Sequence, residues 1–552
     1  MNRREMLATA TLPYAHRKAA IEAEALPRNL GALLDFAAEG KPEAPALFFF
    51  EQVEEPMSYG TLRERVNRLA NGLARRGVRK GTHVAVMLPN IEEFPVTWLA
   101  LARLGAVMIP VNIAYTPREL AYVLDNGDAE FLILHHDYLS TWREIGAFPH
   151  PLKEADVFLV GGDSDGRSRW EDLLEGQSVV YEGEDPDIDD LLNIQYTSGT
   201  TGFPKGCMLS HRYWLTLGKQ NAYRDGLVFE RVLASTPFFY MDPQWLMLMA
   251  FFRKGTLFVA RRQSASRFMD WVRAHRIQFT LMPDVVLKQP PSALDRTHEL
   301  IRVNVYGLSS GNHGLLEDRF DVSAREAFGM TEIGTGLFMP IEEAGMIGTG
   351  SCGIPAPFRE AYVADDEGRA VADGQTGELL VRGPGILRGY YKKPEATAAA
   401  FFGDWFRTGD LFRRDERGYY YIVGRKKDMI RRAGENIAAH ELESVLVAVP
   451  EVAEAAVVPV KDDTRGEEVK AYVVLRPGVD RAQALDRLIE HCMRSLAPFK
   501  VPRYFAFRSA FEKTASGKIS KPSLLAESDD LRAGSFDRSS GTWWPEAAPA
   551  ES

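Results

Sequence analysis

The 552-residue sequence contains little cysteine and no long apolar run. Its three cysteines, Cys207, Cys352 and Cys492, are scattered along the chain. They support neither a disulfide framework nor a cysteine metal cluster, and they are typical of a reducing compartment. The longest wholly apolar stretch, 245–252, is far too short to span a bilayer. These two absences predict a cytoplasmic protein without an integral membrane segment.

An excess of positive charge is also lacking. The formal net charge is −10, which argues against nonspecific binding of nucleic acid. The N-terminal region offers no convincing export signal either, because threonines and a proline interrupt residues 6–15 and a basic cluster follows at once. An anionic substrate would therefore need local basic residues, and no nucleic-acid partner is expected.

Helical and strand patterns alternate over the first 330 residues. A chain of this length is too long for one core and indicates two or three domains. Thr116 and Glu119 form a capping box, with proline at the first helical position. Because the strands are continuously apolar, the alternation predicts a parallel sheet covered on both faces. The expected helices are 61–76, 91–104 and one opening at 117, and the expected strands are 84–88, 106–111 and 131–134.

The pattern changes in the second part of the chain. Short strands with glycine, proline and aspartate turns predict a β-rich subdomain at about 354–424. Helices near 439–449 and 481–496, with strands near 452–459 and 469–475, indicate a small α+β domain. We therefore expect a large α/β domain at 1–426, a small domain at 427–525 and, from its polar composition, a disordered tail at 526–552.

One stretch carries the strongest chemical signal: Tyr196-Thr-Ser-Gly-Thr-Thr-Gly-Phe-Pro-Lys-Gly206, which follows a strand-like apolar run. Glycines let such a loop turn sharply, so that backbone N–H groups and hydroxyls can surround a polyphosphate. The spacing of the ATPase phosphate loop is absent. A flexible surface loop would explain the glycines but neither the hydroxyls nor the Pro-Lys ending. The predicted phosphate-binding residues are Thr197, Ser198, Gly199, Thr200, Thr201 and Gly202, with Lys205 at the rim.

This stretch resembles the signature of the adenylate-forming superfamily, which comprises acyl- and aryl-CoA synthetases, firefly-type luciferases and peptide-synthetase adenylation domains. Further motifs follow in the family's order at 328–332, 405–410, 424–432 and 514–519, and the likeness extends from about residue 30 to about residue 525. The resemblance implies a large N-terminal domain and a small mobile C-terminal domain. It also implies an ATP-dependent acid–CoA ligase that forms an acyl-adenylate, then an acyl-CoA, from a small carboxylic acid, ATP and coenzyme A, with Mg²⁺.

The resemblance assigns roles around the nucleotide. Phe328 would lie against adenine, Thr331 would contact the α-phosphate, and Glu332 would hold Mg²⁺. A carboxylate beside a phosphate loop makes sense only with a cation between the two anions. Asp410 would accept hydrogen bonds from the ribose hydroxyls, and Arg425 would reach ribose and phosphate. Further expected ATP or AMP contacts are Gly329, Met330, Ser309, Ser310 and Gly311.

Other roles belong to the C-terminal part. Lys518 would bring a positive charge to the transition state in which a carboxylate attacks a phosphate. The Lys427 position is the family's hinge, and Gly434 and Glu435 match the loop that lines the pantetheine channel. Charge alone suggests that Arg431 and Arg432 meet the phosphates of CoA; a solvated basic turn or a nucleic-acid patch is the competing interpretation.

Two departures from the family pattern concern the acid. Tyr240 stands where the aromatic motif at 237–245 usually has histidine, and the segment 305–326 is shortened, which puts the adenine contacts there in doubt. Both features resemble the crotonobetaine/carnitine-CoA ligase branch. The expected acyl-pocket residues, each of which could instead be plain core, are Phe239, Tyr240, Asp242, Trp245, Met249 and Phe338. Asp242 could attract a trimethylammonium group, although a simple Asp-Pro turn is the preferred interpretation.

Alternatives stay open at this point. A carrier-protein thiol could replace CoA as the acceptor, or the chain could be a silent nucleotide-binding relative. The intact Lys205, Glu332, Asp410, Arg425 and Lys518 speak against the second alternative. The sequence does not identify the acid, and it leaves a monomer and a homodimer equally open.

Overall fold

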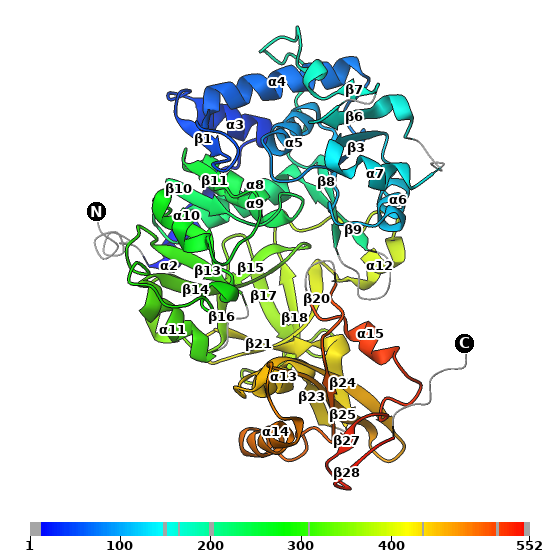
Figure 1. Cartoon of the computed structure of the whole chain (residues 1–552). Helices are drawn as coiled ribbons and strands as arrows, with labels where there is room; N and C mark the ends of the chain where they lie inside the picture. Colours follow the sequence, from blue (N-terminus) through cyan, green and yellow to red (C-terminus); the bar gives the residue numbers. More distant parts are fainter. Residues whose placement is uncertain are drawn as a thin grey trace. The chain divides into compact units, whose positions relative to one another are not determined.

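The computed structural model describes residues 13–146, 152–163, 166–197, 204–306, 310–432, 435–514 and 518–545 (Figure 1). They fall into two compact units. The larger comprises Met1–Ala361 and Val381–Phe406, and the smaller comprises Tyr362–Leu380 and Arg407–Ser552. Within the described ranges, no helix is long and apolar enough to cross a membrane. The fold is mixed α/β, as predicted.

One sheet of the larger unit has the order β7-β6-β5-β3-β4-β8-β9. Its neighbouring strands are parallel except for the last pair, in which β9 runs antiparallel to β8. The parallel strands predicted near 84, 106 and 131 are confirmed as β3, β4 and β5. The bounds are β3 His83–Met87, β4 Val107–Pro110, β5 Phe131–His135, β6 Val157–Val160, β7 Ser168–Arg169, β8 Leu191–Thr197 and β9 Lys205–Ser210.

The second sheet of this unit has the order β16-β15-β14-β13-β12-β10-β11-β1-β2. Its strands from β14 to β1 are parallel, with antiparallel strands at both ends. The bounds are β1 Pro45–Phe48, β2 Met57–Ser58, β10 Arg231–Ala234, β11 Thr256–Val259, β12 Phe279–Leu281, β13 Arg302–Val305, β14 Ser323–Met330, β15 Gly334–Phe338 and β16 Ser351–Pro355.

The helices of the larger unit follow their sequence signals. Thr116 and Glu119 form the predicted capping box of α6, because each side chain accepts a hydrogen bond from the other residue's backbone N–H. Ser210 caps α8 by accepting from the Tyr213 N–H. The bounds are α2 Tyr14–Ala23, α3 Leu30–Ala38, α4 Tyr59–Arg75, α5 Glu93–Leu104, α6 Pro117–Asn126, α7 Leu139–Arg143, α8 His211–Tyr223, α9 Met241–Phe252, α10 Phe268–Ala274, α11 Ser310–Phe320 and α12 Pro394–Ala399.

The smaller unit contains a β-rich part with the strand order β17-β18-β20-β21, in the region where short strands were predicted. By these unit limits, β17 and β20 begin in the larger unit and β18 ends there. The bounds are β17 Glu360–Ala364, β18 Thr376–Arg382, β20 Trp405–Arg414 and β21 Tyr420–Arg425; the short β19 Phe401–Phe402 pairs with β20.

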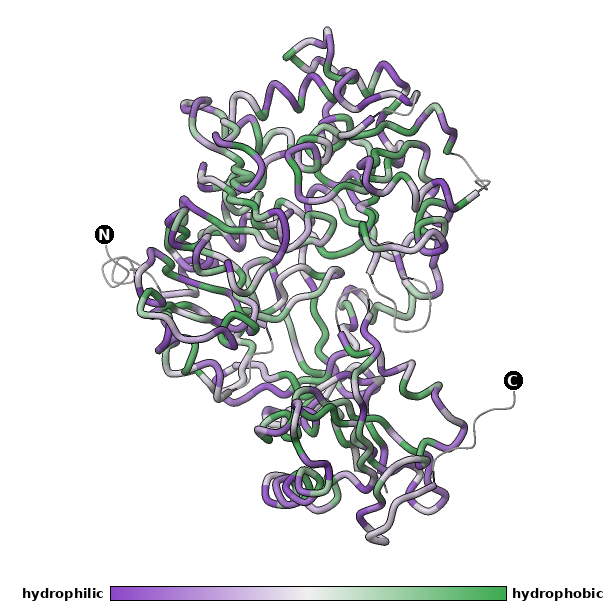
Figure 2. The backbone as a smooth tube through the Cα atoms, in the orientation of Figure 1, coloured by the Kyte–Doolittle hydropathy of each residue, from purple (hydrophilic) through white to green (hydrophobic). Residues whose placement is uncertain are grey.

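A second sheet of the smaller unit has the order β23-β22-β25-β26-β27-β28, with β24 paired to β25. Leu442, Leu446 and Leu488 bring helices α13 and α14 onto one apolar core, and Figure 2 shows the central strands there as apolar. The bounds are β22 Met429–Arg432, β23 Glu435–Ala438, α13 Ala439–Val447, β24 Val452–Asp462, β25 Gly466–Leu475, α14 Arg481–Ser495, β26 Tyr504–Arg508 and α15 Lys521–Leu525.

The tail departs from the expected disorder. Residues 527–545 are described, and they contain β27 (Phe536–Asp537) and β28 (Thr542–Trp543), which extend the sheet from β26. Asp537 is only 2% exposed, and its carboxylate pairs with Arg503 at 3.1 Å. The polar segment that predicted disorder thus includes a buried carboxylate, whose partner Arg503 directly precedes β26.

Candidate active site

The β8–β9 hairpin holds the base of the predicted phosphate loop. Thr197 and Lys205 are register partners at the open end of the antiparallel pair, and the Thr197 hydroxyl donates to the Lys205 carbonyl oxygen at 3.4 Å. Residues 198–203 lie outside the described ranges, so the predictions for Ser198, Gly199, Thr200, Thr201 and Gly202 stay untested there. The hairpin therefore fixes the two ends of the loop beside each other.

Tyr390 links Lys205 to Glu332. The Lys205 ammonium lies 4.3 Å from the centroid of the Tyr390 ring. The Tyr390 hydroxyl donates to Glu332 Oε1 at 2.9 Å. Both Tyr390 and Glu332 are buried, at 6% and 7% exposure. Burial and the nearby Glu332 charge raise the pKa of Tyr390, so its hydroxyl keeps the proton that it donates.

Backbone hydrogen bonds fix the segment 387–391 that carries this tyrosine. The Leu387 N–H donates to the Glu332 carbonyl, and the Tyr391 N–H donates to the Gly206 carbonyl. Gly389 has a φ of 139°, and a Cβ there would lie 2.7 Å from a methyl carbon of Thr397. Sequence reasoning missed Tyr390, because Gly389-Tyr390 reads as an ordinary turn followed by an aromatic residue.

Cys207 is buried beside this group, and it forms an isolated antiparallel bridge with Tyr390. Burial raises the pKa of its thiol, and the Glu332 charge raises it further, whereas Lys205 and a hydrogen bond with Thr197 act in the opposite direction. The thiol is therefore held neutral. The backbone bridge from Cys207 to Tyr390, and the bond from Tyr390 to Glu332, join the hairpin base to this carboxylate.

The predicted 328–332 motif spans the turn from β14 to β15. Phe328 and Met330 are half-buried and Gly329 is exposed, so this edge is open to a ligand. A Cβ on Gly329 would lie 2.6 Å from the Gly334 carbonyl oxygen, which explains the glycine. The Tyr213 hydroxyl donates to the Thr331 carbonyl at 2.9 Å and fixes the backbone next to Glu332.

The shortened adenine segment is described only in part. Ser309 lies outside the described ranges. Ser310 begins α11, and Gly311 is exposed in its first turn. Their adenine contacts remain predictions.

The smaller unit brings Asp410, Arg425 and Lys518 together. Asp410 and Arg425 are register partners of β20 and β21, and Arg425 Nε lies 2.9 Å from Asp410 Oδ1. Asp410 is 1% exposed. Packing around its amine lowers the pKa of Lys518, and the charge of Arg425 lowers it further, whereas Asp410 acts in the opposite direction. The Lys518 ammonium is therefore within electrostatic range of the aspartate and the arginine of two earlier motifs.

Glu378 fixes the backbone and the basic side chains next to Asp410. Its carboxylate accepts from Arg407 at 2.6 Å and from Lys426 at 3.2 Å, and it accepts from the Gly409 N–H at 3.1 Å. Burial alone would raise the pKa of Glu378, but the bonds from Arg407 and Lys426 outweigh it and lower the pKa. Glu378 thus fixes the turn that presents Asp410. In the sequence, Glu378 is noticeable only as part of the pair Gly377-Glu378 before the 405–410 motif, and that pair does not indicate what the side chain does.

The side chain of the predicted hinge residue Lys427 lies outside the description, as does Gly434. The neighbouring Lys426 is held by Asp366 at 2.8 Å and by Glu378. Glu435 is described as the first residue of β23, through its backbone alone. The hinge and pantetheine assignments stay predictions.

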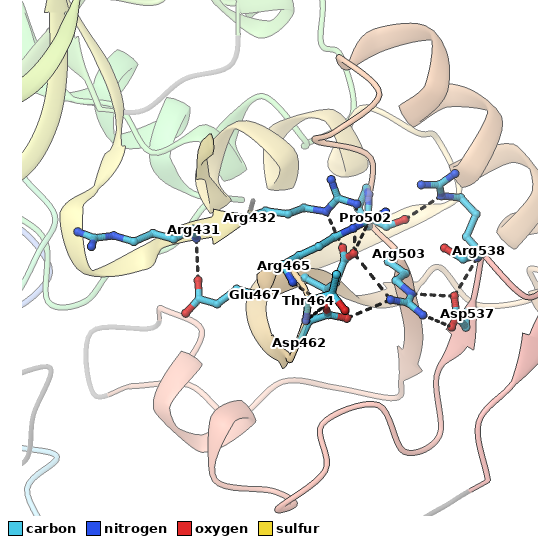
Figure 3. A network of polar contacts seen from close by, with 12 residues as sticks. Arg431, Arg432, Asp462, Thr464, Arg465, Glu467, Pro502, Arg503, Asp537 and Arg538 are labelled. Atoms are coloured by element: carbon cyan, nitrogen blue, oxygen red, sulfur yellow. Dashed lines mark hydrogen bonds and ion pairs between the residues drawn. The ribbon is translucent and has the colours of Figure 1, made fainter. Parts of the chain in front are cut away.

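Arg431 and Arg432 have different surroundings (Figure 3). The Arg432 guanidinium pairs with Glu468 through two bonds, at 2.7 and 3.1 Å. Glu468 is 1% exposed, and Arg465 and Arg503 also pair with it. The Arg431 backbone N–H donates to Glu467, and its side chain extends away from the network. The geometry therefore favours Arg431 over Arg432 as a contact for a CoA phosphate.

The predicted acyl-pocket residues separate into two groups. Phe239 and Tyr240 lie together, with ring centroids 4.6 Å apart, and the half-buried Tyr240 hydroxyl accepts from Asn112 at 3.4 Å. Trp245 and Met249 are buried in α9. Phe338 is buried in β15, where its ring packs against Tyr14 and under the guanidinium of Arg224. Their burial therefore favours the interpretation that Trp245, Met249 and Phe338 belong to the core.

Asp242 lies in the first turn of α9, whereas a simple Asp-Pro turn was the preferred interpretation. Its carboxylate accepts from Trp245 Nε1 at 3.1 Å. Burial raises the pKa of Asp242, and the Trp245 bond opposes this rise. Near a helix N-terminus a carboxylate is stabilised by the backbone dipoles, so the residue has a structural role without any ligand.

The donor set around Glu332 fits Mg²⁺. This ion prefers oxygen ligands and is bound in nucleotide sites by one or two carboxylates plus phosphates. Tyr390 occupies Oε1 of Glu332, and Oε2 has no hydrogen bond from the residues that the structure describes. Those residues contain no group of three or more histidine, cysteine, aspartate or glutamate side chains that could hold a metal ion, so substrate phosphates would have to complete the shell.

Comparison with known proteins decides the family. Residues 34–391 match the model of the AMP-binding enzyme, and residues 441–518 match that of the AMP-binding enzyme C-terminal domain. The chain belongs to the AMP-binding enzyme family. Among curated relatives of this AMP-binding enzyme, the crotonobetaine/carnitine–CoA ligase of Salmonella paratyphi C (strain RKS4594) is 34% identical over 521 residues, which cover 90% of this chain and 99% of that protein.

Solved structures agree with this assignment. ATP-bound MatB from Rhodopseudomonas palustris is 28% identical, with a TM-score of 0.80 over 90% of this chain and 98% of that one. The anthranilate CoA ligase AuaEII, solved with anthranoyl-AMP, is 24% identical, with a TM-score of 0.81 over 92% of this chain and 98% of that one, and it supports the fold. The AMP-binding enzyme described here is an ATP-dependent, AMP-forming acid–CoA ligase.

Proposed function

We propose that this enzyme joins a small carboxylic acid to CoA in two steps within the cytoplasm. The acid's carboxylate attacks the α-phosphorus of ATP, forming an acyl-adenylate while pyrophosphate leaves. The CoA thiol then attacks the acyl carbon, and AMP leaves. The grouping of Lys518 with Asp410 and Arg425 carries the proposal, because it brings the charge needed for the first step into electrostatic range of the side chains that we assign to the ribose.

The larger unit supplies the phosphate contacts. We assign Lys205 and Thr197 to the phosphates of ATP, Thr331 to its α-phosphate and Glu332 to Mg²⁺. Bound Mg²⁺ would neutralise phosphate charge and stabilise the departing pyrophosphate. Phe328, Gly329 and Met330 lie on an edge open to a ligand, which supports their assignment to adenine. The adenine contacts of Ser310 and Gly311 are proposed on the family resemblance alone.

The smaller unit supplies the ribose contacts and the catalytic charge. The buried carboxylate of Asp410 can accept from ribose hydroxyls through two oxygens, while Arg425 holds its orientation. The Lys518 ammonium would bridge the acid's carboxylate and the α-phosphate, and so offset their repulsion in the transition state. Burial and the charge of Arg425 lower the pKa of this ammonium, and Asp410 opposes the shift.

The second step needs different groups at the same adenylate. We propose that the smaller domain turns at Lys427 between the steps, which withdraws Lys518 and presents Gly434 and Glu435 to pantetheine. Arg431 would then meet a phosphate of CoA. If the acceptor is instead a carrier-protein thiol, the contact between Arg431 and a CoA phosphate is not needed.

The class of acid is proposed more broadly. The 34% identical relative is named for crotonobetaine and carnitine, and Asp242 lies among aromatic residues, so acids with a quaternary ammonium group belong in any screen. Asp242 already accepts a hydrogen bond from Trp245, so neutral fatty and aryl acids belong in the same screen. A panel of all three types, scored by CoA-dependent AMP formation, identifies the acid.

With an accepted acid, Lys518→Ala tests the proposal. We expect ATP–pyrophosphate exchange to fall by about two to three orders of magnitude, as is typical for loss of one group that stabilises developing charge. Thioester formation from supplied acyl-adenylate should change by less than about threefold, because Lys518 has no part in that step.

Lys513→Ala is the matched control, since this lysine lies five residues away and pairs with Glu454 on the surface. It should leave both half-reactions intact. If Lys518→Ala lost both half-reactions equally, the role assigned to Lys518 would be contradicted. If a carrier protein proved a better acceptor than CoA, the enzyme would belong to the alternative class.

A further inference from the structure

Tyr390 stands between two side chains of opposite charge. Its ring face receives the Lys205 ammonium at 4.3 Å, and its hydroxyl donates to Glu332 Oε1 at 2.9 Å. Among the described residues, no ion pair joins Lys205 directly to Glu332. One buried aromatic side chain thus contacts both charged groups and occupies the place where they could meet.

A direct ion pair would damage a site built for MgATP. The pair would cancel the lysine charge that a phosphate needs, and it would occupy carboxylate oxygens that a hard cation needs. The Tyr390 ring offers the ammonium a favourable but uncharged surface, so the full positive charge remains available. Its hydroxyl binds one carboxylate oxygen and leaves the other, Oε2, for a cation.

The surroundings of Tyr390 suit it to holding its neighbours. The backbone of segment 387–391 is bonded on one side to Glu332 and on the other to Gly206 and Met208 of β9. Tyr391 binds Asp128 through its own hydroxyl at 2.8 Å, which anchors the segment to the end of α6. Tyr390 is therefore fixed from both sides before any ligand arrives, which is the condition for preorganising a polar site.

We propose that Tyr390 is a positioning residue that keeps Lys205 and Glu332 apart and orients both for MgATP. This inference rests on the proposed roles of Lys205 and Glu332. The hydroxyl orients the carboxylate toward the metal, and the ring holds the ammonium toward the phosphates. Loss of each part of the side chain therefore has a different consequence.

The test is ATP binding measured by calorimetry, without acid, in the presence and absence of Mg²⁺. Tyr390→Phe keeps the ring and removes the hydroxyl. Its affinity for MgATP should fall about fivefold to tenfold, the loss of roughly one hydrogen bond to a charged group, while its affinity for ATP without Mg²⁺ should stay within about twofold of wild type. A role in folding alone would affect both affinities alike.

Tyr390→Leu removes the ring as well, and it should weaken binding both with and without Mg²⁺, because Lys205 is released to pair with Glu332. Peptide mass spectrometry after brief acetylation of the ligand-free proteins gives a second readout. Lys205 should react as in wild type in Tyr390→Phe and several-fold more slowly in Tyr390→Leu, since an amine held in an ion pair is less available to the reagent.

Tyr223→Phe is the matched control. It removes a tyrosine hydroxyl of the same unit that donates to the Phe252 carbonyl at 3.0 Å and takes no part in the proposed site, and it should leave both affinities unchanged. Wild-type MgATP binding by Tyr390→Phe would overturn the inference, provided that Glu332→Gln weakens the same binding. If Glu332→Gln is itself without effect, the metal role assigned to Glu332 falls, and the inference falls with it.

Discussion

Arg431 and Arg432 are adjacent in β22, but one contact gives them different proposed roles. Of these two arginines, only Arg432 pairs its guanidinium with the buried Glu468. Arg431→Ala should raise the KM for CoA several-fold and leave the KM for ATP unchanged, because it removes a surface charge that meets a phosphate. Steady-state kinetics with each substrate varied in turn measures both effects.

Arg432→Ala is the comparison variant. It leaves Glu468 short of one buried partner, so it should destabilise the smaller unit by about 2–4 kcal/mol while the KM for CoA changes little in the protein that remains folded. Urea unfolding measures the loss. A raised KM for CoA in Arg432→Ala, with Arg431→Ala unaffected, would reverse the assignment.

Individual residues also show what a sequence can reveal about a site. Short continuous motifs contain Lys205, Glu332, Asp410, Arg425 and Lys518, so the chemistry of these residues can be predicted from local sequence. Tyr390 contacts Glu332 across 58 positions, and the three arginines that hold Glu468 come from separate segments. Such roles depend on partners that only folding brings together, so no local sequence pattern predicts these roles.

At the scale of elements, the start of α8 combines a cap with a buried histidine. Ser210 caps the helix, and the Leu30 N–H donates to His211 Nδ1. Burial lowers the pKa of His211 to about 4; Asp190 opposes the shift and Lys80 adds to it. Between the ordinary histidine value of about 6.5 and about 4, the unfolded chain binds a proton that the folded chain does not, so stability falls as the pH falls through this window.

His211→Gln should remove that part of the pH dependence. The wild type should lose up to about 3 kcal/mol through His211 between pH 7 and pH 4, and the variant should lose correspondingly less. Urea unfolding at several pH values measures the slope. Ser210→Ala is the control, since loss of the cap should cost about 1 kcal/mol at every pH. A parallel pH profile in His211→Gln would contradict the linkage.

The elements differ in how far their sequence predicts them. The capping box of α6 and the apolar strands β3, β4 and β5 are local signals, and they appear where expected. Strands β27 and β28 carry no such signal, because two-residue strands acquire their form from a neighbour, here β26. Composition predicts whether a segment can bury apolar surface on its own, and it overlooks a segment that is held by pairing.

At the scale of the whole molecule, the division into units differs from the order of the motifs. The motifs place a hinge at Lys427, whereas compactness assigns residues 362–380 and 407–425 to the smaller unit. Lys426 explains part of this assignment, since its ammonium pairs with Asp366 and Glu378 in those segments. The hinge at Lys427 remains a prediction about motion, and motion can begin inside a compact unit when few residues change their backbone angles.

Because each unit has its own apolar clusters, we expect calorimetry to resolve two unfolding transitions. Asp537→Asn should lower only one of them, the transition of the smaller unit, by breaking the buried pair with Arg503 at a cost of about 2–4 kcal/mol. His211→Gln should alter the pH dependence of the other transition alone. Glu367→Gln, which changes an exposed pair with Arg369, should shift neither transition. A single transition that moves with both Asp537→Asn and His211→Gln would show that the two cores unfold as one cooperative body, and a hinge between them would then have to bend without loosening either.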